Sequence, residues 1–412
     1  MTQINIQLDI KSLEITAQSI DNKGNIILDV VSKNSNSICH KCGKPATKRD
    51  GTAPSRVIRH LSILDTPVYL RITPIRYSCQ HCDNNPTTTE QYDWCDRNAS
   101  TTKGLEEYLM RCLINSTVED VAKKEYIGAD AVQGSLDRQV NKVIDWTTLS
   151  DIETIGIDEI ALKKGHNSFV TIISAKSKDL GLIVLGVLDG REKDQVKEFL
   201  EKIPENLRKT VCQVCTDMYD GFVNAAVEVF GAQCLVVDRY HVAKLYRKPL
   251  DALRIKEMAR LKTILSVDDY AKLEGMMWIL RKNHECLSEA QKDSLSFLYQ
   301  HSPALKQAHT YALRLTHIFN THSNKKDAIA KMNRWVTSIE KSGLQLFNSF
   351  VTTLNKYKAY IGNYFKSRKN SGFVEGLNNK IKVLKRRCYG LCKTESLFQR
   401  IFLDLQGLRI YA

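Results

Sequence analysis

The stretch 151-DIETIGIDEIALKKGHNSFVTIISAKSKDLGLIVLGVLDG-190, followed by 208-RKTVCQVCTD-217 and 232-AQCLVVDRYHV-242, decides the fold. It contains five short apolar runs rich in Ile and Val, whose lengths are typical of strands. Segments 192–203 and 219–230 have helical periodicity and follow the third and the fourth run. Three strands followed by alternating helix and strand predict a mixed α/β sheet covered by helices.

Two aspartates stand where such a sheet would hold a ligand. Asp158 lies inside the first run and Asp217 ends the fourth, whereas Glu159 points to the opposite face from Asp158. A carboxylate in an apolar strand is costly unless it is paired or binds a metal, and ligands gather at the ends of neighbouring strands. We expect Asp158 and Asp217 to hold one cationic site. The alternative for each is a turn residue or a helix cap.

A third carboxylate, Glu375, lies far downstream in 370-NSGFVEGLNNKIKVLKRRCYG-390. A helix from about Gly372 would bury one apolar face, made of Phe373, Leu377, Ile381 and Leu384. The opposite face would carry Glu375 beside amides and bases, which are Asn378, Asn379, Lys382 and Arg386. An acid among phosphate-binding groups fits a site with two Mg²⁺ ions, or Mn²⁺ in their place, that activates an attacking oxygen and stabilises a leaving one.

Four of these segments together, 156–166, 215–222, 236–245 and 371–390, resemble the DDE transposases of bacterial insertion sequences. The resemblance extends from about Ser37 to the end of the chain and is greatest to the ISL-three family, which carries an N-terminal zinc-binding domain. It implies an RNase H-like catalytic domain in which Mg²⁺ is held by three acids, namely Asp158, Asp217 and Glu375.

Asp238 and His241 resemble the Asp-x-x-His signature that several such transposases carry after the second acid. Either a structural salt-bridged pair or an accessory role at the metal site accounts for these two residues.

Cysteine spacing predicts a second metal site. Cys39-x-x-Cys42 and Cys79-x-x-Cys82 supply four thiolates for tetrahedral Zn²⁺. The segment 63–79 between them alternates like a hairpin. By contrast, Cys212 and Cys215 lie three apart in a strand and face opposite ways, so we expect no site there.

Several basic segments predict DNA contacts. The segment 41–76 of the zinc unit is rich in Lys and Arg. Residues 99–145 have the pattern of a helix-turn-helix, with an ordinary two-helix linker as the alternative. Its second helix would present Gln133, Arg138 and Gln139 to a groove. Near the third acid, phosphate contacts are expected from Lys380, Lys382, Lys385, Arg386 and Arg387.

Bulk properties agree with a DNA-binding protein. The chain has 412 residues and a net charge of +14, which favours a polyanionic partner. No apolar run is long enough for a membrane span, so we expect a cytoplasmic, nucleoid-associated protein. The predicted domains are a zinc unit (1–95), a helix-turn-helix (96–148), a catalytic domain (149–242 with 360–412) and an all-helical insertion (243–359). Trp278 and Trp335 in the insertion are expected to pack in its core or to stack on a flipped base.

These features predict a transposase that binds the terminal inverted repeats of an insertion sequence, cleaves DNA and transfers the cut strand to target DNA. Synapsis of two ends implies double-stranded DNA as partner and a homodimer or larger assembly. The alternatives are an RNase H-like nuclease without strand transfer and a non-catalytic, transposase-derived DNA-binding regulator.

Overall fold

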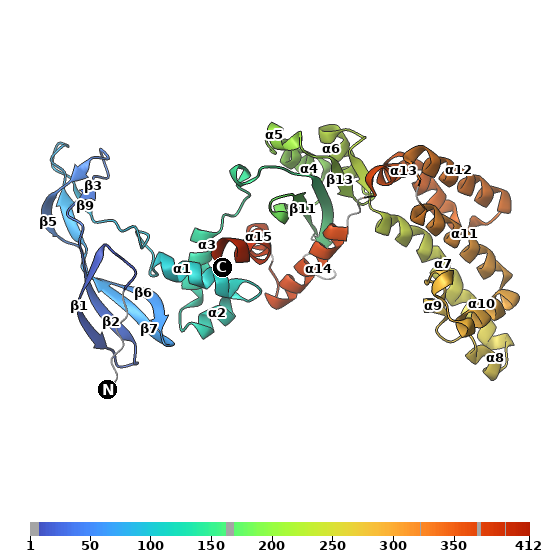
Figure 1. The fold of residues 1–412 in the computed structure, drawn as a ribbon, viewed down its shortest axis with the longest axis horizontal. Coiled ribbons are helices and arrows are strands. Elements are labelled where there is room, and N and C mark those ends of the chain that lie inside the picture. The colour runs from blue at the N-terminus through green and yellow to red at the C-terminus, as the bar shows by residue number, and fades with distance from the viewer. Residues whose placement is uncertain (1–7, 162–168, 322, 369–371, 392) are drawn as a thin grey trace. The chain divides into compact units, whose positions relative to one another are not determined.

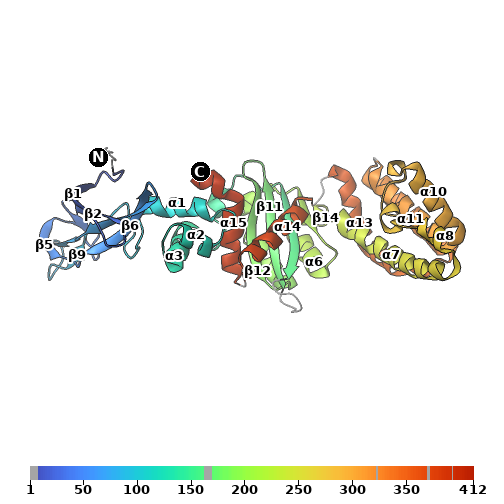
Figure 2. The same cartoon turned by 90° about the horizontal axis from the view of Figure 1, so that it is seen from below.

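The computed structural model describes residues 8–161, 169–321, 323–368, 372–391 and 393–412. It divides into two compact units, Met1–Ile144 with Ile381–Ala412, and Asp145–Lys380. The chain passes between the units inside helix α14 (Gly372–Arg387). Figures 1 and 2 label the helices and strands of both units.

The first unit begins with three small sheets. The largest has the order β1-β2-β7-β6, and its strands are β1 Leu13–Ile20, β2 Ile26–Ser32, β7 Thr66–Ile72 and β6 Arg56–Ile63. Its inward side chains, among them Ile58, Val68 and Leu70, are fully buried. The other two sheets have the orders β5-β8-β9 and β3-β4, and their strands are β5 Lys48–Thr52, β8 Ile75–Ser78, β9 Thr87–Thr89, β3 Ser37–Ile38 and β4 Pro45–Ala46.

Segment 63–79 is not a hairpin, so this prediction was wrong. β7 pairs with β6 and β2, whereas β8 pairs with β5 and β9. Pro74 lies between β7 and β8 and has no amide hydrogen, which ends the ladder and lets the chain cross to another sheet. The hairpin lies one strand earlier, where Leu64 and Asp65 turn β6 into β7 with φ of 46° and 65°.

The helices expected within 99–145 are present as α1 (Lys103–Leu113), α2 (Val118–Lys124) and α3 (Ala129–Gln139). They share a buried core with α15 (Thr394–Tyr411), to which Leu109, Leu136 and Leu403 contribute. Asp404 of α15 accepts a hydrogen bond from the Asn115 amide at 2.9 Å. The structure therefore joins 381–412 to these helices, whereas the predicted catalytic domain included 360–412.

The second unit contains the five-stranded sheet, in the order β12-β11-β10-β13-β14. All five runs identified in the sequence form strands, which are β10 Thr154–Ala161, β11 Phe169–Ser177, β12 Gly181–Asp189, β13 Gln213–Thr216 and β14 Leu235–Val237. β11 is antiparallel to both its neighbours, whereas β10, β13 and β14 run parallel. The two expected helices are α4 (Lys193–Glu201) and α6 (Asp220–Phe230), and the short α5 (Glu205–Arg208) follows α4.

Two glycines bring helices close to opposite faces of this sheet. A Cβ on Gly186 of β12 would lie 2.5 Å from the Phe199 ring of α4. A Cβ on Gly156 of β10 would lie 2.4 Å from Val374 at the start of α14. Gly186 is in register with Ile173 and through it with Ile157, so Gly156 belongs to the other face. The sheet therefore lies between α4 and the first turns of α14, both of which are labelled in Figure 1.

The residues after β14 are helical, as predicted for the insertion. They form α7 Arg239–Ile264, α8 Val267–Ala271, α9 Met276–Ile279, α10 Glu289–His301, α11 Pro303–Asn320, α12 Lys325–Ser342 and α13 Asn348–Ser367. α13 returns to the sheet, where Nδ2 of Asn363 donates to the carbonyls of Ala232 and Leu235 at 2.9 and 2.6 Å. Trp335 is buried in the helical core, as predicted, whereas Trp278 is 62% exposed. Among the described residues, no helix combines the length and hydropathy that a membrane span requires.

Candidate metal sites and nucleic-acid interface

Four thiols gather in the first unit. The Sγ atoms of Cys39, Cys42, Cys79 and Cys82 all lie within 4.8 Å of one another. Three of the Sγ–Sγ distances are 4.0 Å (Cys39–Cys82), 3.6 Å (Cys42–Cys79) and 3.8 Å (Cys79–Cys82). Tetrahedral zinc with Zn–S bonds of about 2.3 Å requires sulfur atoms about 3.8 Å apart. The cluster thus has the dimensions of a Cys₄ zinc site.

Backbone geometry prepares these thiols for a metal. The amide of Lys41 donates to Cys39 Sγ, and the amide of His81 donates to Cys79 Sγ, each at 3.4 Å. Amide hydrogens of Cys42 and Lys41 lower the pKa of Cys39 to about 6, which favours the thiolate that zinc binds. The neighbouring thiol of Cys42 raises the pKa of Cys82 to about 12, because two thiolates side by side repel each other without a metal.

The second site is a row of aspartates across three parallel strands. Ile157 of β10 is in register with Thr216 of β13, which is in register with Val237 of β14. Each of these three residues is followed in the chain by an aspartate: Asp158 within β10, Asp217 after β13 and Asp238 after β14. Neighbouring strands lie about 4.8 Å apart, so adjacent members of this row are neighbours in space. The sequence predicted that Asp158 and Asp217 lie together, and the strand register adds Asp238 as the third member of the row.

Asp158 is held from two sides. The Glu159 amide donates to its Oδ1 at 2.8 Å, and Nδ2 of Asn378 on α14 donates to its Oδ2 at 2.5 Å. Burial raises the pKa of the Asp158 carboxyl, and the negative charge of Asp217 raises it further. His241 opposes this rise. An opposite charge beside this buried carboxyl would therefore be favourable.

Asp217 and Asp238 also contact the backbone after them. The Tyr219 amide donates to Asp217 Oδ1 at 3.0 Å, and Asp238 caps α7 by accepting from the Tyr240 amide at 2.8 Å. Burial raises the pKa of Asp217, and His241 again opposes the rise. His241 Nε2 lies 3.9 Å from Asp238 Oδ2. Asp217 and Asp238 thus make the turn and helix-cap contacts of the alternative interpretation and also lie in the aspartate row.

Glu375 lies on α14, one turn before Asn378, and its side chain is exposed. Asn378 is only 7% exposed, although the helical pattern placed it on the polar face, because it bonds Asp158. Among the described residues, only the four cysteines form a group of three or more metal-binding side chains whose ligand atoms lie within 4.8 Å. The three acids thus do not converge to that degree.

One polar atom beside the row suits a cation. Asn378 Oδ1 belongs to the amide that bonds Asp158, is buried and has no hydrogen-bond partner within the part of the chain that the structure describes. Buried polar atoms without partners are rare in proteins, and a bound ion is one of the explanations for such an atom. Carboxylate and amide oxygens are ligands that suit Mg²⁺. The residues present therefore fit a divalent metal.

Arg191, just after β12, was not identified from the sequence. It pairs with Glu159 at 3.1 Å, and its guanidinium lies 5.2 Å from the Phe169 ring centroid and 5.0 Å from that of Tyr219. Aromatic faces attract and orient a cation. Its charge acts to lower the pKa of Asp217, so a fixed cation lies near the aspartate row. Its position directly after a strand, in Gly190-Arg191, was the available signal.

Gly156→Ala tests how closely α14 must approach this site. The new Cβ would lie 2.4 Å from Val374 and 2.9 Å from Ser174 Oγ, so α14 must shift. We expect a loss of about 1–3 kcal/mol in the free energy of unfolding, measured with urea.

Gly376→Ala is the matched control on α14. Its Cβ would meet nothing within 4 Å, and alanine favours a helix. Equal stability of the Gly156 variant and the wild type would contradict the close packing of α14.

The expected groove-facing residues of α3 have mixed surroundings. Arg138 donates to the buried Glu106 through Nε at 2.9 Å and Nη2 at 2.5 Å, and Gln139 donates to the other oxygen of Glu106 at 3.1 Å. Gln133 bonds exposed Asp137 at 3.2 Å. We therefore retain only Gln133 as a candidate base contact on α3, because Glu106 fixes the other two side chains.

The basic residues around the third acid also divide. Arg387 pairs with Asp404, whose side chain is 2% exposed, at 2.5 Å. Lys382 and Arg386 are exposed, and Lys380 and Lys385 are half-buried. Lys382 and Arg386 are the stronger candidates for phosphate contacts.

In the zinc unit, three predicted basic residues have internal partners. Arg59 is buried, Arg71 pairs with Asp29 at 2.5 Å, and Arg56 donates to the Ala99 carbonyl at 2.7 Å. The exposed basic side chains lie beside the cysteines and on β5 and β8, and they are Lys44, Lys48, Arg49 and Arg76.

Comparisons with known proteins agree with the four-cysteine zinc site and show the family of the chain. A model of the ISL3 family, described as "Transposase", matches residues 155–401, and one described as "zinc-finger of transposase IS204/IS1001/IS1096/IS1165" matches residues 35–82. A transposase for insertion sequence element IS1001 from Bordetella parapertussis is 28% identical over 378 residues, which cover 90% of this chain and 89% of that protein. A transposase for IS1557 from Mycobacterium tuberculosis is 21% identical over 393 residues, covering 90% and 86%.

Among solved structures, the Drosophila P element transposase strand transfer complex is similar with a TM-score of 0.41 and 12% identity. The match covers 77% of this chain and 94% of that one. A likeness at this level carries no argument about the site.

Proposed function

We propose that this chain, which belongs to the ISL3 family of transposases, cleaves DNA at the ends of an insertion sequence and joins those ends to target DNA. The proposed catalytic acids are Asp158, Asp217 and Glu375. The observation that carries this proposal is the strand register, which aligns Asp158 with Asp217 beneath the helix that bears Glu375. Three acids contributed by segments so far apart in the chain are unusual unless a common ligand needs them.

The fold of the catalytic unit supports an RNase H-like assignment. Its sheet has one antiparallel strand among four that share a direction, with helices on both faces. A helix-turn-helix is proposed for α2 and α3, since the Thr117 hydroxyl caps α2 and a four-residue turn leads into α3. With the zinc ribbon, it would bind the terminal inverted repeats. Two bound ends would require at least a homodimer.

Mg²⁺ is the proposed metal at the acidic site, held by Asp158, Asp217 and Glu375. When bound, it would supply charge that activates the attacking oxygen and stabilises the leaving one. The chain itself positions the ligands. Asn378 fixes Asp158 and the Tyr219 amide fixes Asp217. His241 opposes the rise in the pKa of both Asp158 and Asp217, which is the accessory role we assign to the Asp238–His241 pair.

A strand-transfer assay tests the function. Purified protein is mixed with a labelled duplex carrying its own element end, a target plasmid and Mg²⁺. End-specific cleavage with joining is the expected result. Cleavage without joining would indicate a nuclease. Specific binding without metal-dependent chemistry would instead indicate a regulator.

The pKa shifts predict how stability depends on pH and metal. Both aspartates have folded-state pKa values raised by burial, so their neutral forms stabilise the fold at low pH. In EDTA, the free energy of unfolding should fall as pH rises from about 4 through the raised pKa values. Mg²⁺ at neutral pH should restore about 1.4 kcal/mol at ten times its dissociation constant.

The measurement is the unfolding midpoint against pH and Mg²⁺ concentration. Asp158→Asn should remove both the pH-dependent fall attributable to this carboxyl and most of the Mg²⁺ effect. An Mg²⁺ effect that survives in this variant would place the metal elsewhere.

A further inference from the structure

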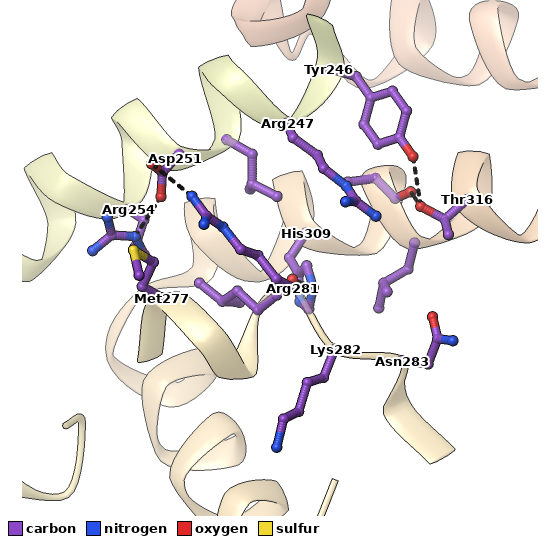
Figure 3. Close-up of a pocket in the computed structure, with 14 residues that line it drawn as sticks. Tyr246, Arg247, Asp251, Arg254, Met277, Arg281, Lys282, Asn283, His309 and Thr316 are labelled. Carbon is purple, nitrogen blue, oxygen red and sulfur yellow. Dashed lines mark hydrogen bonds and ion pairs between the residues drawn. The ribbon is translucent and has the colours of Figure 1, made fainter. Parts of the chain in front are cut away.

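A pocket in the helical insertion is lined mainly by basic and apolar side chains (Figure 3). It lies between α7, α11 and the segment after α9, and its cavity volume is about 40 Å³, enough for small groups but not for a whole nucleotide. Four basic residues line it, namely Arg247, Arg254, Arg281 and Lys282, and Asp251 is its one acid. This is an excess of positive charge in a concave site.

The single acid is already engaged. Asp251 accepts from Arg254 at 2.8 Å and pairs with Arg281 at 3.4 Å. Lys282 donates to neutral Gln291 at 3.3 Å, and within the described residues Arg247 has no acidic partner within 4 Å. Cations brought together without enough acids repel one another, so an anion in the pocket would be stabilised.

The rest of the pocket is uncharged. Leu250, Leu280 and Ala312 form an apolar wall. His309 is buried, and its Nε2–H donates to the Leu280 carbonyl at 3.0 Å. Its Nδ1 accepts from the Tyr299 hydroxyl at 2.7 Å, and burial lowers its pKa to about 4. It is therefore neutral at pH 7 and adds no charge.

An aromatic ring adjoins the basic residues. Trp278 is 62% exposed, and the guanidinium of Arg281 lies 5.8 Å from its ring centroid. An exposed indole offers a flat face on which an unpaired base can stack, and adjacent arginine and lysine can bind that nucleotide's phosphate. A base within a duplex is already stacked and would not reach the ring.

We propose that the basic mouth of this pocket and the adjoining Trp278 bind one nucleotide of a single DNA strand, with its phosphate at Arg247, Arg281 and Lys282 and its base on Trp278, outside the cavity. The inference rests on the proposed function, which supplies DNA as ligand. Asp238 begins α7 at the aspartate row, and Arg247 lies nine residues later, about 14 Å along the helix. That distance equals about four nucleotide steps, so a strand leaving the catalytic site can reach the pocket.

The test measures binding of a fluorescein-labelled twenty-nucleotide oligo-dT to the full-length protein by anisotropy, in EDTA and with excess unlabelled duplex. Trp278→Ala should weaken binding about tenfold. Arg247→Gln should weaken it and reduce the slope of log K against log salt by about 0.7. Both side chains are exposed, so the unfolding midpoint should not change.

Lys256→Gln is the charge-matched control, because Lys256 is exposed on the same helix but does not line the pocket. It should bind oligo-dT like the wild type. Equal losses in the Lys256 and Arg247 variants, or no loss in Trp278→Ala, would overturn the proposal. So would displacement of the oligonucleotide by dATP or tripolyphosphate at equal concentration, which would indicate a site for free nucleotides.

Failure of this inference and failure of the proposed function are separable. Binding is measured in EDTA, so it does not depend on metal-dependent cleavage or joining. A protein that transfers strands but binds oligo-dT independently of Trp278 and Arg247 would refute the pocket alone.

Discussion

Asp217→Asn should reduce DNA cleavage and joining by on the order of a thousandfold or more, because it removes one carboxylate of the proposed metal site without changing side-chain volume. The residue follows β13 and adjoins Asp158 through the strand register. Cleavage of a labelled element end in Mg²⁺, followed as a single-turnover rate, measures the effect.

The same variant should fold at least as stably as the wild type in EDTA. The charge of Asp217 raises the pKa of the buried Asp158 carboxyl, so removing it relieves a repulsion. Asp194→Asn, at an exposed position in the first turn of α4, is the matched control and should keep full activity. Retention of strand transfer in Asp217→Asn would refute the acidic triad. Lost activity with a lowered unfolding midpoint would mean that Asp217 has a structural role.

Cys79→Ser should have the second large effect, loss of the bound zinc and unfolding of the ribbon. Cys79 is fully buried, and its Sγ lies 3.6 Å from Cys42 Sγ and 3.8 Å from Cys82 Sγ. In small zinc domains the metal contributes about 10 kcal/mol or more to folding. Elemental analysis should find about one zinc ion per wild-type chain and none in the variant.

Binding to the terminal repeat should fall with the zinc, whereas the unfolding transition of the catalytic unit should persist, because that unit has its own core. Cys212→Ser is the control, since Cys212 is exposed and outside the cluster. A full equivalent of zinc in Cys79→Ser would show that this thiol is not a ligand.

The catalytic sheet could be predicted because its information is local. Runs such as 169–177 are apolar over the length of a strand, and the residue that ends each strand follows directly from its position. Asp158 and Asp217 were therefore found without contacts. The thiol cluster could be predicted equally well, because the Cys-x-x-Cys spacing determines the ligand geometry.

The features that the sequence did not predict depend on tertiary contacts between elements that are far apart in the chain. Helical periodicity assigns Asn378 to a polar face, and only the approach of α14 to Gly156 shows that it is buried against Asp158. Arg138 has the composition of a groove-facing residue, but Glu106, 32 positions earlier, fixes its direction. The packing of α15 against α1 likewise joins segments about 290 residues apart.

The direction of the chain at the aspartate row has an electrostatic consequence. α6 begins three residues after Asp217, and α7 begins directly after Asp238, which caps it. Both helices thus start at the edge of the sheet where the carboxylates lie. A helix amino terminus carries a partial charge of about +0.5 from its aligned peptide dipoles. The edge of the sheet that carries the three aspartates therefore also carries two helix amino termini with partial positive charge. These termini reduce the electrostatic repulsion among the three carboxylates and favour the phosphate oxygens of an incoming strand.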